Sequence, residues 1–425
     1  MMDTQALLHL AATYDADFGP HAHQIVVQEA AGAVFTDTDG NQIIDLSDII
    51  VNIGHAHPHQ LKALRQALDQ MIAGKSGLMN PARARLAERL VSLTPDNLTK
   101  AYFVTSGGES VDWAIRIARR ATGKHEILSF WGGVYGRTYA NISLNGLVKR
   151  RRQFGPVMPG VIHAPFPYCY RCPFGKQLES CDFFCVDFLD EILKHASTDD
   201  VAALIVEPYQ GVGGLIFPPE GYLLRLQEWA AANDIVFILD EIQSSFGRTG
   251  RLFALEWEGL RPQMLCLGKG LGGGLSLAAL LAEDWLWDAL APGELGGGSG
   301  GSFLASTSAL AVLDILHDEK LAEHAHSVGA YFLERFRQLQ QRFPAIIGDV
   351  RGRGLAVALE FVTDPETRTP YPEIVQHIGR AAYARGVYIG GRSHILDVRP
   401  PLVITQEQAA YAADVIETAL IEALG

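Results

Sequence analysis

The residues best suited to chemistry are a lysine and an aspartate, each of which follows an apolar run. Lys269 lies between two glycines within Leu265–Gly274, and Asp240 follows the apolar run Val236–Leu239. A lysine amine can form a Schiff base with a carbonyl carbon, and flanking glycines let the backbone approach a bound group where a Cβ would clash. A carboxylate at the end of a buried strand can hold a proton on a ring nitrogen.

An amine and a carboxylate in this arrangement suit pyridoxal phosphate (PLP) chemistry. PLP needs a lysine for the Schiff base and an acid that keeps its pyridine nitrogen protonated, so that the ring accepts electrons. A Gly-Lys-Gly alone is also typical of a surface turn, but the upstream segment Asp240–Gln243 favours the functional interpretation. We therefore predict Lys269 and Asp240 as catalytic residues and PLP as the cofactor.

The composition indicates a folded enzyme with more than one domain. The chain has 425 residues, of which 48% are hydrophobic and 20% are charged, values typical of globular enzymes too large for one core. The net charge of −13 argues against nucleic acid or an anionic membrane as a partner. The longest apolar stretch, 275–282, is too short to cross a bilayer, and the sequence start lacks a basic region typical of secretion signals. We expect a cytoplasmic enzyme that acts on small molecules.

Apolar runs alternate with helical patterns along the middle of the chain. The runs 101–104, 202–206 and 235–239 are apolar at every position, which indicates parallel strands buried on both faces. Between them, 111–119 carries apolar residues at helical spacing. This alternation predicts an α/β sheet with helices on both sides.

The two ends of the chain have a different pattern. Residues 33–44 predict a hairpin with Asp39-Gly40 at the turn, and 347–359 indicates further short strands. We expect a large domain over 56–305 and a smaller α+β domain built from 1–55 and 306–425.

Several motifs, in order along the chain, resemble those of the class III aminotransferases, which are PLP enzymes of fold type I. They are Gly54-His55-Ala56-His57-Pro58, Thr105–Ser110, Glu207–Gly211, Asp240–Gly250 and the Gly-Lys-Gly around Lys269. The match covers nearly the whole chain and is nearest to the branch that holds dialkylglycine decarboxylase and the aminolactam and amino-acid racemases. The resemblance implies a mostly parallel seven-stranded sheet in the large domain, and a homodimer or a dimer of dimers.

The resemblance also implies a role for each motif. Ser106, Gly107 and Gly108 would form the phosphate-binding loop, where backbone N–H groups and a helix N-terminus attract the anion. A plain strand-to-helix turn would explain these glycines equally well without the other motifs. Gln243 would donate to the phenolic oxygen of the cofactor ring. Glu207 would face the substrate, although Glu-Pro is also common in loops.

Two departures from the family pattern concern the cofactor. Val134 occupies the position at which relatives carry an aromatic residue stacked on the ring, and the aromatic residue here is Tyr135. Either the ring packs against the aliphatic Val134, or Tyr135 takes the stacking role through a shifted backbone. Relatives also contact the phosphate with a threonine from the neighbouring subunit, and Ser299 or Ser302 is the candidate here.

A third departure concerns the substrate. Many relatives carry Arg-x-x-Pro-Pro near the C-terminus, and that arginine binds the substrate α-carboxylate. Asp397 holds this position here, and a carboxylate there would repel another one. We expect an amine substrate without an α-carboxylate; a clamp formed by Arg399 or Arg392 is the alternative. Asp48 is a further substrate-side candidate and would favour a cationic amine.

These departures favour transamination over other reactions on the same cofactor. Racemases of this branch place a second base two residues after the glutamine of Glu-Pro-x-Gln, where this chain has Val212. Dialkylglycine decarboxylation depends on the missing arginine. We predict an omega- or amine-transaminase-like enzyme that uses an oxo acid or aldehyde such as pyruvate as acceptor, with Lys269 moving the proton. An aminolactam or amino-acid racemase, a dialkylglycine-type decarboxylase, and a catalytically silent PLP-binding protein are the alternatives.

Four cysteines lie close together in the sequence, at Cys169, Cys172, Cys181 and Cys185. Their spacing resembles that of a tetrahedral zinc site. A reduced, cysteine-bearing insertion explains them as well, because relatives carry a similar segment. We predict no metal site, with these cysteines as the minor alternative, and we interpret His55 and His57 of the first motif as turn residues.

Overall fold

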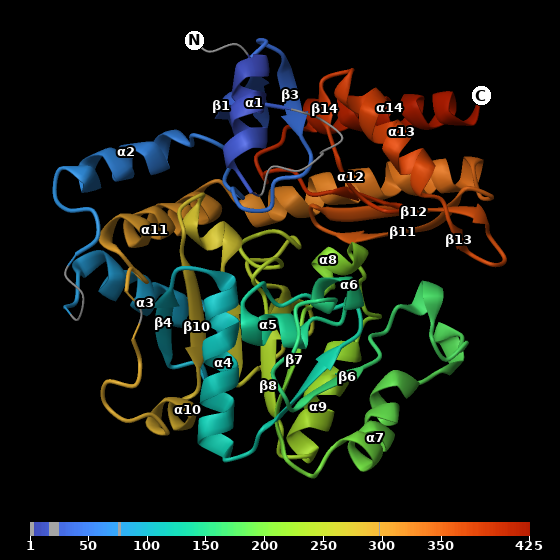
Figure 1. Cartoon of the computed structure of the whole chain (residues 1–425). Helices are drawn as coiled ribbons and strands as arrows, with labels where there is room; N and C mark the ends of the chain where they lie inside the picture. Colours follow the sequence, from blue (N-terminus) through green and yellow to red (C-terminus); the bar gives the residue numbers. More distant parts are fainter. Residues whose placement is uncertain (1–3, 17–24, 75–77, 297) are drawn as a thin grey trace. The chain divides into compact units, whose positions relative to one another are not determined.

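The computed structural model describes residues 4–16, 25–74, 78–296 and 298–425. The chain divides into two compact units (Figure 1): a large unit, His59–Lys320, and a small unit formed by Met1–Pro58 with Leu321–Gly425. The large unit extends to Lys320 rather than ending at the expected residue 305, because helix α11 (Phe303–Asp318) packs on α3 (Pro81–Leu93).

A seven-stranded sheet forms the centre of the large unit, in the order β4-β10-β9-β8-β7-β5-β6. Strand β10 is antiparallel to both its neighbours, and the other pairs are parallel. The predicted fold class, with a mostly parallel seven-stranded sheet, is confirmed. The strands are β4 (Lys100–Val104), β5 (Glu126–Phe130), β6 (Val161–Ala164), β7 (Val201–Val206), β8 (Val236–Asp240), β9 (Met264–Leu267) and β10 (Ala278–Ala282).

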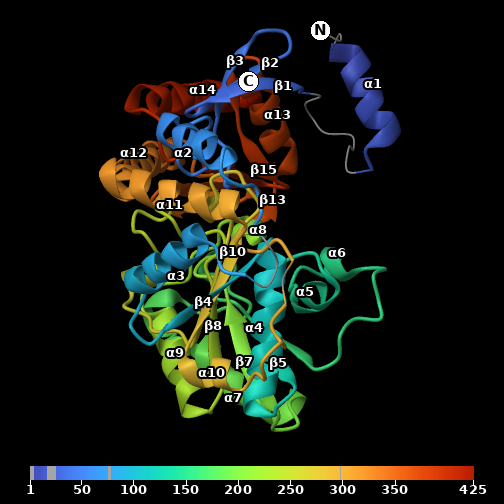
Figure 2. The same ribbon diagram turned by 90° about the vertical axis from the view of Figure 1, so that its left-hand side faces the viewer.

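Helices cover both faces of this sheet. Figures 1 and 2 show α4 (Gly107–Thr122) against one face and α9 (Tyr222–Ala232) against the other. Every residue of β7 and β8 is buried, as expected for parallel strands with a layer on each side. The remaining helices of this unit are α2 (Pro58–Leu68), α5 (Tyr139–Leu144), α6 (Val148–Arg151), α7 (Phe184–Ala196), α8 (Gly211–Gly214), α10 (Asp284–Asp288) and the 3₁₀ turns η1 (Cys169–Arg171), η2 (Leu178–Ser180), η3 (Ala254–Trp257) and η4 (Lys269–Gly272).

The small unit contains two further sheets, with the orders β1-β2-β3-β14 and β11-β12-β16-β15. The predicted hairpin is present: β2 and β3 pair antiparallel, and Gly40 in the turn has φ +85°. The strands are β1 (Val27–Ala31), β2 (Val34–Asp37), β3 (Gln42–Asp45), β11 (Ile347–Arg353), β12 (Ala356–Asp364), β13 (Thr369–Pro370), β14 (Val387–Tyr388), β15 (Gly390–Arg392) and β16 (Ile395–Val398). The helices are α1 (Thr4–Tyr14), α12 (Leu321–Arg342), α13 (Pro372–Tyr383) and α14 (Gln406–Leu424).

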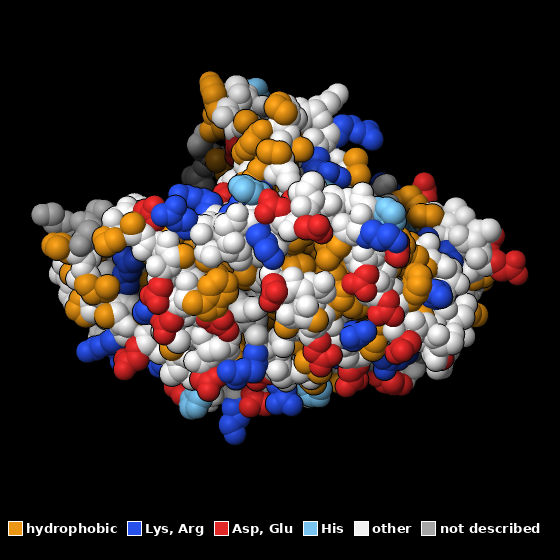
Figure 3. Space-filling model, turned by 90° about the horizontal axis from the view of Figure 1, so that it is seen from below, with side chains coloured by type: hydrophobic (Ala, Val, Ile, Leu, Met, Phe, Trp, Pro, Cys, Tyr) orange, Lys and Arg blue, Asp and Glu red, His pale blue; other side chains and the backbone are white. Residues whose placement is uncertain are grey.

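Two features of the whole chain bear on its possible partners. Among the described residues, no helix is both long and apolar enough to cross a membrane. Acidic and basic side chains are interspersed on the face shown in Figure 3.

Candidate active site

The predicted catalytic residues lie at the carboxyl edge of the central sheet. Glu207 directly follows β7, Asp240 is the last residue of β8, and Lys269 begins η4 just after β9. Asp240 pairs with Cys266 of β9 in the strand register, which brings these three strand ends side by side. Ligands of open α/β sheets bind at this edge because the loops after parallel strands diverge there.

A cavity of about 270 Å³ lies at this edge. Most of the predicted cofactor residues line it, whereas Ser106, Ser299 and Ser302 do not. The predicted residues that line it are Gly107, Gly108, Val134, Tyr135, Glu207, Asp240, Gln243 and Lys269.

Glu207 is buried in the cavity wall and is held by the backbone. Its Oε1 accepts the N–H of Val134 at 3.0 Å, and its Oε2 accepts the N–H of Gly211 at 3.2 Å. Burial, reinforced by the nearby Asp240 carboxyl, raises the pKa of Glu207 to about 8. Near pH 7 this group is therefore largely a neutral acid that can donate a proton.

Asp240 is the second buried carboxyl of the cavity. Burial raises the pKa of Asp240 to about 6, although the N–H of Ile242, at 3.0 Å from its Oδ1, and the charge of Lys269 oppose the rise. A buried carboxylate gains most from a cation beside it. This environment fits a carboxylate that pairs with a protonated ring nitrogen.

Lys269 has an unusual backbone conformation. Its φ is +43°, in the left-handed region, which costs about 1–3 kcal/mol for a residue other than glycine. The side chain is half-buried and lines the cavity. The turn therefore holds the lysine at the strand ends at an energetic cost, a pattern common at functional sites.

The cavity residues fit PLP. The amide oxygen Oε1 of Gln243 is buried and has no hydrogen-bond partner among the described residues, so this side chain is available to a ligand. A Cβ on Gly107 would lie 2.8 Å from Ile242 Cδ1, and one on Gly108 would lie 2.9 Å from Asn141 Oδ1. These two glycines begin the long helix α4, whose N-terminal N–H groups suit a phosphate.

Ser106 serves the helix rather than the cavity. Its hydroxyl accepts the N–H of Glu109 at 3.2 Å and so caps the N-terminus of α4. In this position Ser106 stabilises the first turn of α4 and does not line the cavity.

Tyr135 and Val134 have different surroundings. The Tyr135 side chain belongs to the core of the large unit and is 2% exposed, and its hydroxyl donates to the carbonyl oxygen of Ile205 at 3.1 Å. Val134 is half-buried at the cavity wall. This arrangement favours the first sequence interpretation, in which an aliphatic side chain packs against the cofactor ring.

Ser299 and Ser302, unlike most of the other cofactor candidates, do not line the cavity. Ser302 caps α11 by accepting the N–H of Ala305 at 3.4 Å, and Ser299 is exposed. Their role as phosphate contacts for a neighbouring subunit stays a prediction.

The substrate-side candidates lie in the small unit, where Asp48, Asp397 and Arg399 line a pocket of about 850 Å³. Asp397 is 1% exposed and its Oδ2 pairs with Arg399 Nη2 at 2.7 Å and with Arg392 Nε at 3.3 Å. Asp397 lies in β16, Arg399 directly follows that strand, and Arg392 lies on the neighbouring strand β15. The charge of Asp397 is therefore compensated within the protein. In addition, Nε and Nη1 of Arg399 are buried without a hydrogen-bond partner among the described residues.

The four clustered cysteines line a small cavity of about 20 Å³, and no disulfide joins them. Burial, then the neighbouring thiols, raises the pKa of Cys185 to about 12, so this thiol is neutral near pH 7. In the described part of the chain, no three of these cysteines bring their sulfur atoms within 4.8 Å of one another.

The sequence prediction did not identify two arginines that line the cofactor cavity, Arg137 and Arg150. Arg137 lies two residues after Tyr135, one of the two candidates for stacking on the cofactor ring. This closeness in sequence could have identified Arg137 as a cavity residue. Arg150 lies within the basic run Lys149–Arg152, and such a run usually indicates a solvated surface.

Comparison with known proteins agrees with this geometry. A family model for class III aminotransferases matches residues 17–420. The chain is 36% identical over 398 residues to a probable 4-aminobutyrate aminotransferase from Bacillus subtilis, with 92% of this chain and 91% of that protein covered. It is 33% identical over 405 residues to a leucine/methionine racemase from Thermococcus litoralis, with 94% and 91% covered.

Two solved structures extend the comparison. An (S)-enantioselective omega-transaminase from Thermomicrobium roseum matches with a TM-score of 0.94 and 28% identity over 100% of both chains. An amine transaminase from an uncultivated Pseudomonas species, solved in its PLP-bound form, matches with a TM-score of 0.90 and 30% identity over 96% of this chain and 97% of that one. This chain therefore belongs to the class III aminotransferases and is a PLP-dependent enzyme of fold type I that catalyses transamination.

Proposed function

We propose that the enzyme transfers the amino group of a primary amine without an α-carboxylate to an oxo acceptor such as pyruvate. The observation that carries this proposal is the charge of the small-unit pocket, which is lined by three aspartates and two arginines. Arg392 and Arg399 both pair with the buried Asp397, and the carboxylates of the pocket outnumber its guanidinium groups. The pocket that contains the family's clamp position therefore has no excess of positive charge with which to attract an α-carboxylate.

Each cofactor residue would hold a different part of PLP. The N–H groups of Gly107 and Gly108 would hold the phosphate, Asp240 would hold the ring nitrogen, and Gln243 would hold the ring oxygen. When bound, PLP supplies a carbonyl carbon that reacts with amines and a ring that stabilises negative charge at the neighbouring carbon. The Lys269 amine would accept the proton from the amine substrate and return it.

Glu207 shapes the same cavity through its protonation state. Burial, reinforced by the nearby Asp240 carboxyl, raises the pKa of Glu207 and so favours its uncharged form. A neutral acid leaves the cavity wall able to accommodate an apolar substituent without burying an unpaired charge. This property fits an amine substrate with an uncharged group.

Racemisation is the main competing function. The leucine/methionine racemase relative supports it, but Val212 lines the cofactor cavity, at the position at which the racemases of this branch place an acid. An aliphatic side chain cannot return a proton from the opposite face of the substrate carbon.

The test is an amine panel with pyruvate as acceptor and alanine formation as the readout. 1-Phenylethylamine and benzylamine represent amines without a carboxylate, leucine represents α-amino acids, and 4-aminobutyrate carries a remote carboxylate. We expect kcat/KM to be at least about tenfold higher for the first two than for leucine, a difference of about 1.4 kcal/mol in the transition state. Higher kcat/KM with leucine would contradict the proposal, and inversion of leucine without any acceptor would establish racemisation.

We also propose that the enzyme works as a homodimer or a dimer of dimers in the cytoplasm, with small-molecule amines, oxo acids and aldehydes as its partners and no nucleic acid or membrane. Family resemblance supports the assembly, and the net charge of −13 supports the absence of a nucleic-acid partner. Light scattering after size-exclusion chromatography tests the assembly, and cell fractionation tests the location.

A further inference from the structure

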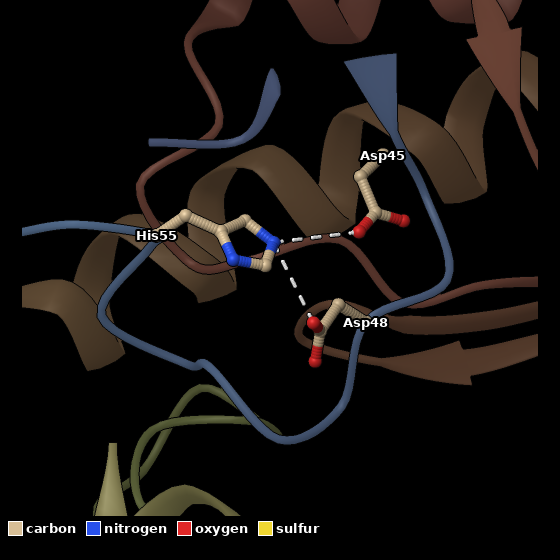
Figure 4. A group of neighbouring side chains, drawn as sticks. All are labelled: Asp45, Asp48 and His55. Carbon is tan, nitrogen blue, oxygen red and sulfur yellow. Dashed lines mark ion pairs between the residues drawn. The ribbon is translucent and has the colours of Figure 1, made fainter. Parts of the chain in front are cut away.

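A second group of chemically active side chains lies in the small unit. Asp45 ends β3, Asp48 lies in the following loop, and His55 lies shortly before α2, and Figure 4 shows their side chains converging. In the described part of the chain, these three form the only set of three or more His, Cys, Asp or Glu ligand atoms within 4.8 Å of one another. His55 Nε2 lies 3.7 Å from Asp45 Oδ2 and 3.5 Å from Asp48 Oδ2.

The backbone orients both carboxylates toward the imidazole. Asp45 Oδ1 accepts the N–H of Ser47 at 2.8 Å, and Asp48 Oδ1 accepts the N–H groups of Ile50 at 2.6 Å and Val51 at 3.1 Å. The second oxygen of each carboxylate is the one that faces the imidazole. In protein metal sites, hydrogen bonds from surrounding groups to the ligand side chains fix the geometry of those ligands.

The backbone around His55 is held equally well. Its N–H donates to the carbonyl of Gly32 and its own carbonyl accepts the N–H of Gly32, both at 2.9 Å. The preceding Gly54 has φ +80°, and a Cβ there would lie 2.4 Å from Val403 Cγ2. The loop therefore presents the imidazole in one orientation.

The distances within the group suit an ion better than direct hydrogen bonds. Separations of 3.5 and 3.7 Å exceed the 2.7–3.2 Å typical of N–H···O bonds. In a tetrahedral zinc site with bonds of about 2.0–2.2 Å, two ligand atoms lie about 3.4 Å apart. The two separations measured here are close to that ligand–ligand distance. The Nε2 atom is buried without a hydrogen-bond partner among the described residues, and the side chain of Asp45, which faces it, is 9% exposed.

We propose that Asp45, Asp48 and His55 bind a divalent transition-metal ion, with Zn²⁺ the best fit. An imidazole nitrogen favours zinc over magnesium or calcium. All three residues line the 850 Å³ pocket, so a fourth position is open to water or to the hydroxyl of a small molecule, as in zinc sites with three protein ligands. The ion neutralises two carboxylates and ties the end of β3 to the loop before α2.

The competing arrangement is a protonated His55 that pairs with both aspartates. The neighbouring Asp45 carboxylate is the largest cause of the raised pKa of His55, burial opposes the rise, and the charge of Asp48 adds to it. An imidazolium would satisfy the two carboxylates without metal. Metal binding separates the two arrangements, because a ligated imidazole must be neutral.

The test uses the PLP-loaded enzyme after removal of metals with a chelator. Zn²⁺ is titrated by calorimetry, and bound metal is counted by mass spectrometry after gel filtration. We expect one tightly bound equivalent in the wild type, and at least about tenfold weaker binding after Asp48→Asn or His55→Gln. The matched control is the double variant His317→Gln, Asp318→Asn, which removes an exposed His–Asp pair at 2.9 Å and should bind zinc like the wild type.

A second readout covers the case in which a variant does not fold. Co²⁺ replaces Zn²⁺ in the wild-type protein, and a tetrahedral site then produces visible absorption at longer wavelengths than that of PLP. Absence of a stoichiometric site in the wild type, or equal zinc affinity in the wild type and the folded variants, would overturn the proposal. This result does not depend on the amine substrate, since transamination is measured separately.

Discussion

At the residue scale, the cofactor cavity combines one lysine with two buried carboxyls of raised pKa. Asp240, with a pKa of about 6, becomes an anion more readily than Glu207, with a pKa of about 8. Two carboxyl groups whose pKa values differ in this way take different roles near pH 7. Asp240 is suited to pair with a cation, and Glu207 is suited to donate a proton.

The substitution Lys269→Ala should reduce transamination by at least about 10³-fold, because the enzyme then loses both its reactive amine and its proton carrier. Alanine, like lysine, has a Cβ, so the energetic cost of the positive φ at position 269 should not change. The variant should therefore fold normally and retain its far-UV circular dichroism spectrum. Borohydride treatment of the wild type followed by peptide mapping should place the cofactor on Lys269. A label on another lysine would contradict the assignment.

The stability of the cofactor-free enzyme should depend on pH through Glu207. Its pKa rises from 4.5 to about 8 on folding, so the folded state holds the proton more tightly than the unfolded state does. The resulting stabilisation is complete below about pH 4.5 and is lost as the pH rises through 8. The melting temperature should therefore fall across this window, and less steeply in Glu207→Gln. Equal slopes in the two proteins would show that Glu207 does not carry the effect.

At the element scale, the start of α4 combines close packing with a helix N-terminus that suits an anion. Gly107 and Gly108 leave no room for a Cβ beside Ile242 and Asn141, and the helix N-terminus favours negative charge. The absence of side chains here serves the packing and would also let a phosphate approach the backbone.

The substitution Gly107→Ala should therefore weaken PLP binding by about tenfold or more, equivalent to about 1.4 kcal/mol. The added Cβ meets three side-chain atoms of Ile242 at 2.8–3.2 Å, and a shift of Ile242 would disturb the cofactor cavity because Ile242 lines it. The control is Gly379→Ala on α13, where nothing lies within 4 Å of the added Cβ. Spectroscopic titration with PLP measures both, and unchanged affinity in Gly107→Ala would argue against a phosphate at this turn.

At the scale of the whole molecule, the predicted assembly bears on the phosphate site. Ser299 and Ser302 do not line the cofactor cavity of their own chain, and the resemblance assigns this contact to a neighbouring subunit. A shared site makes cofactor affinity a property of the assembly.

Mixed assemblies test this assignment directly. The double variant Ser299→Ala, Ser302→Ala should bind PLP about tenfold more weakly, and Lys269→Ala should be inactive. Co-expression of differently tagged chains gives hybrids, in which the lysine of one chain meets the serines of the other. In these hybrids, activity at low PLP concentration should exceed that of either parent. If the double serine variant binds PLP as tightly as the wild type, the shared contact is excluded.

The sequence by itself determined the elements whose signals are local. Strands that are apolar at every position predicted a covered parallel sheet, and the residue types of Lys269 and Asp240 predicted that both serve one PLP cofactor. Residue chemistry and strand periodicity are readable within a few neighbours, which is why these predictions did not need the fold.

Only the tertiary structure decided which distant groups meet. It paired Asp397 with Arg399 and Arg392, buried Tyr135 in the core, and joined α11 to the large unit through its packing on α3. It also turned His55, which the sequence suggested as a turn residue, toward two aspartates. Charge compensation and burial depend on contacts between residues that are far apart in the sequence. Such contacts produce no periodic pattern along the chain, so they could not be predicted from it.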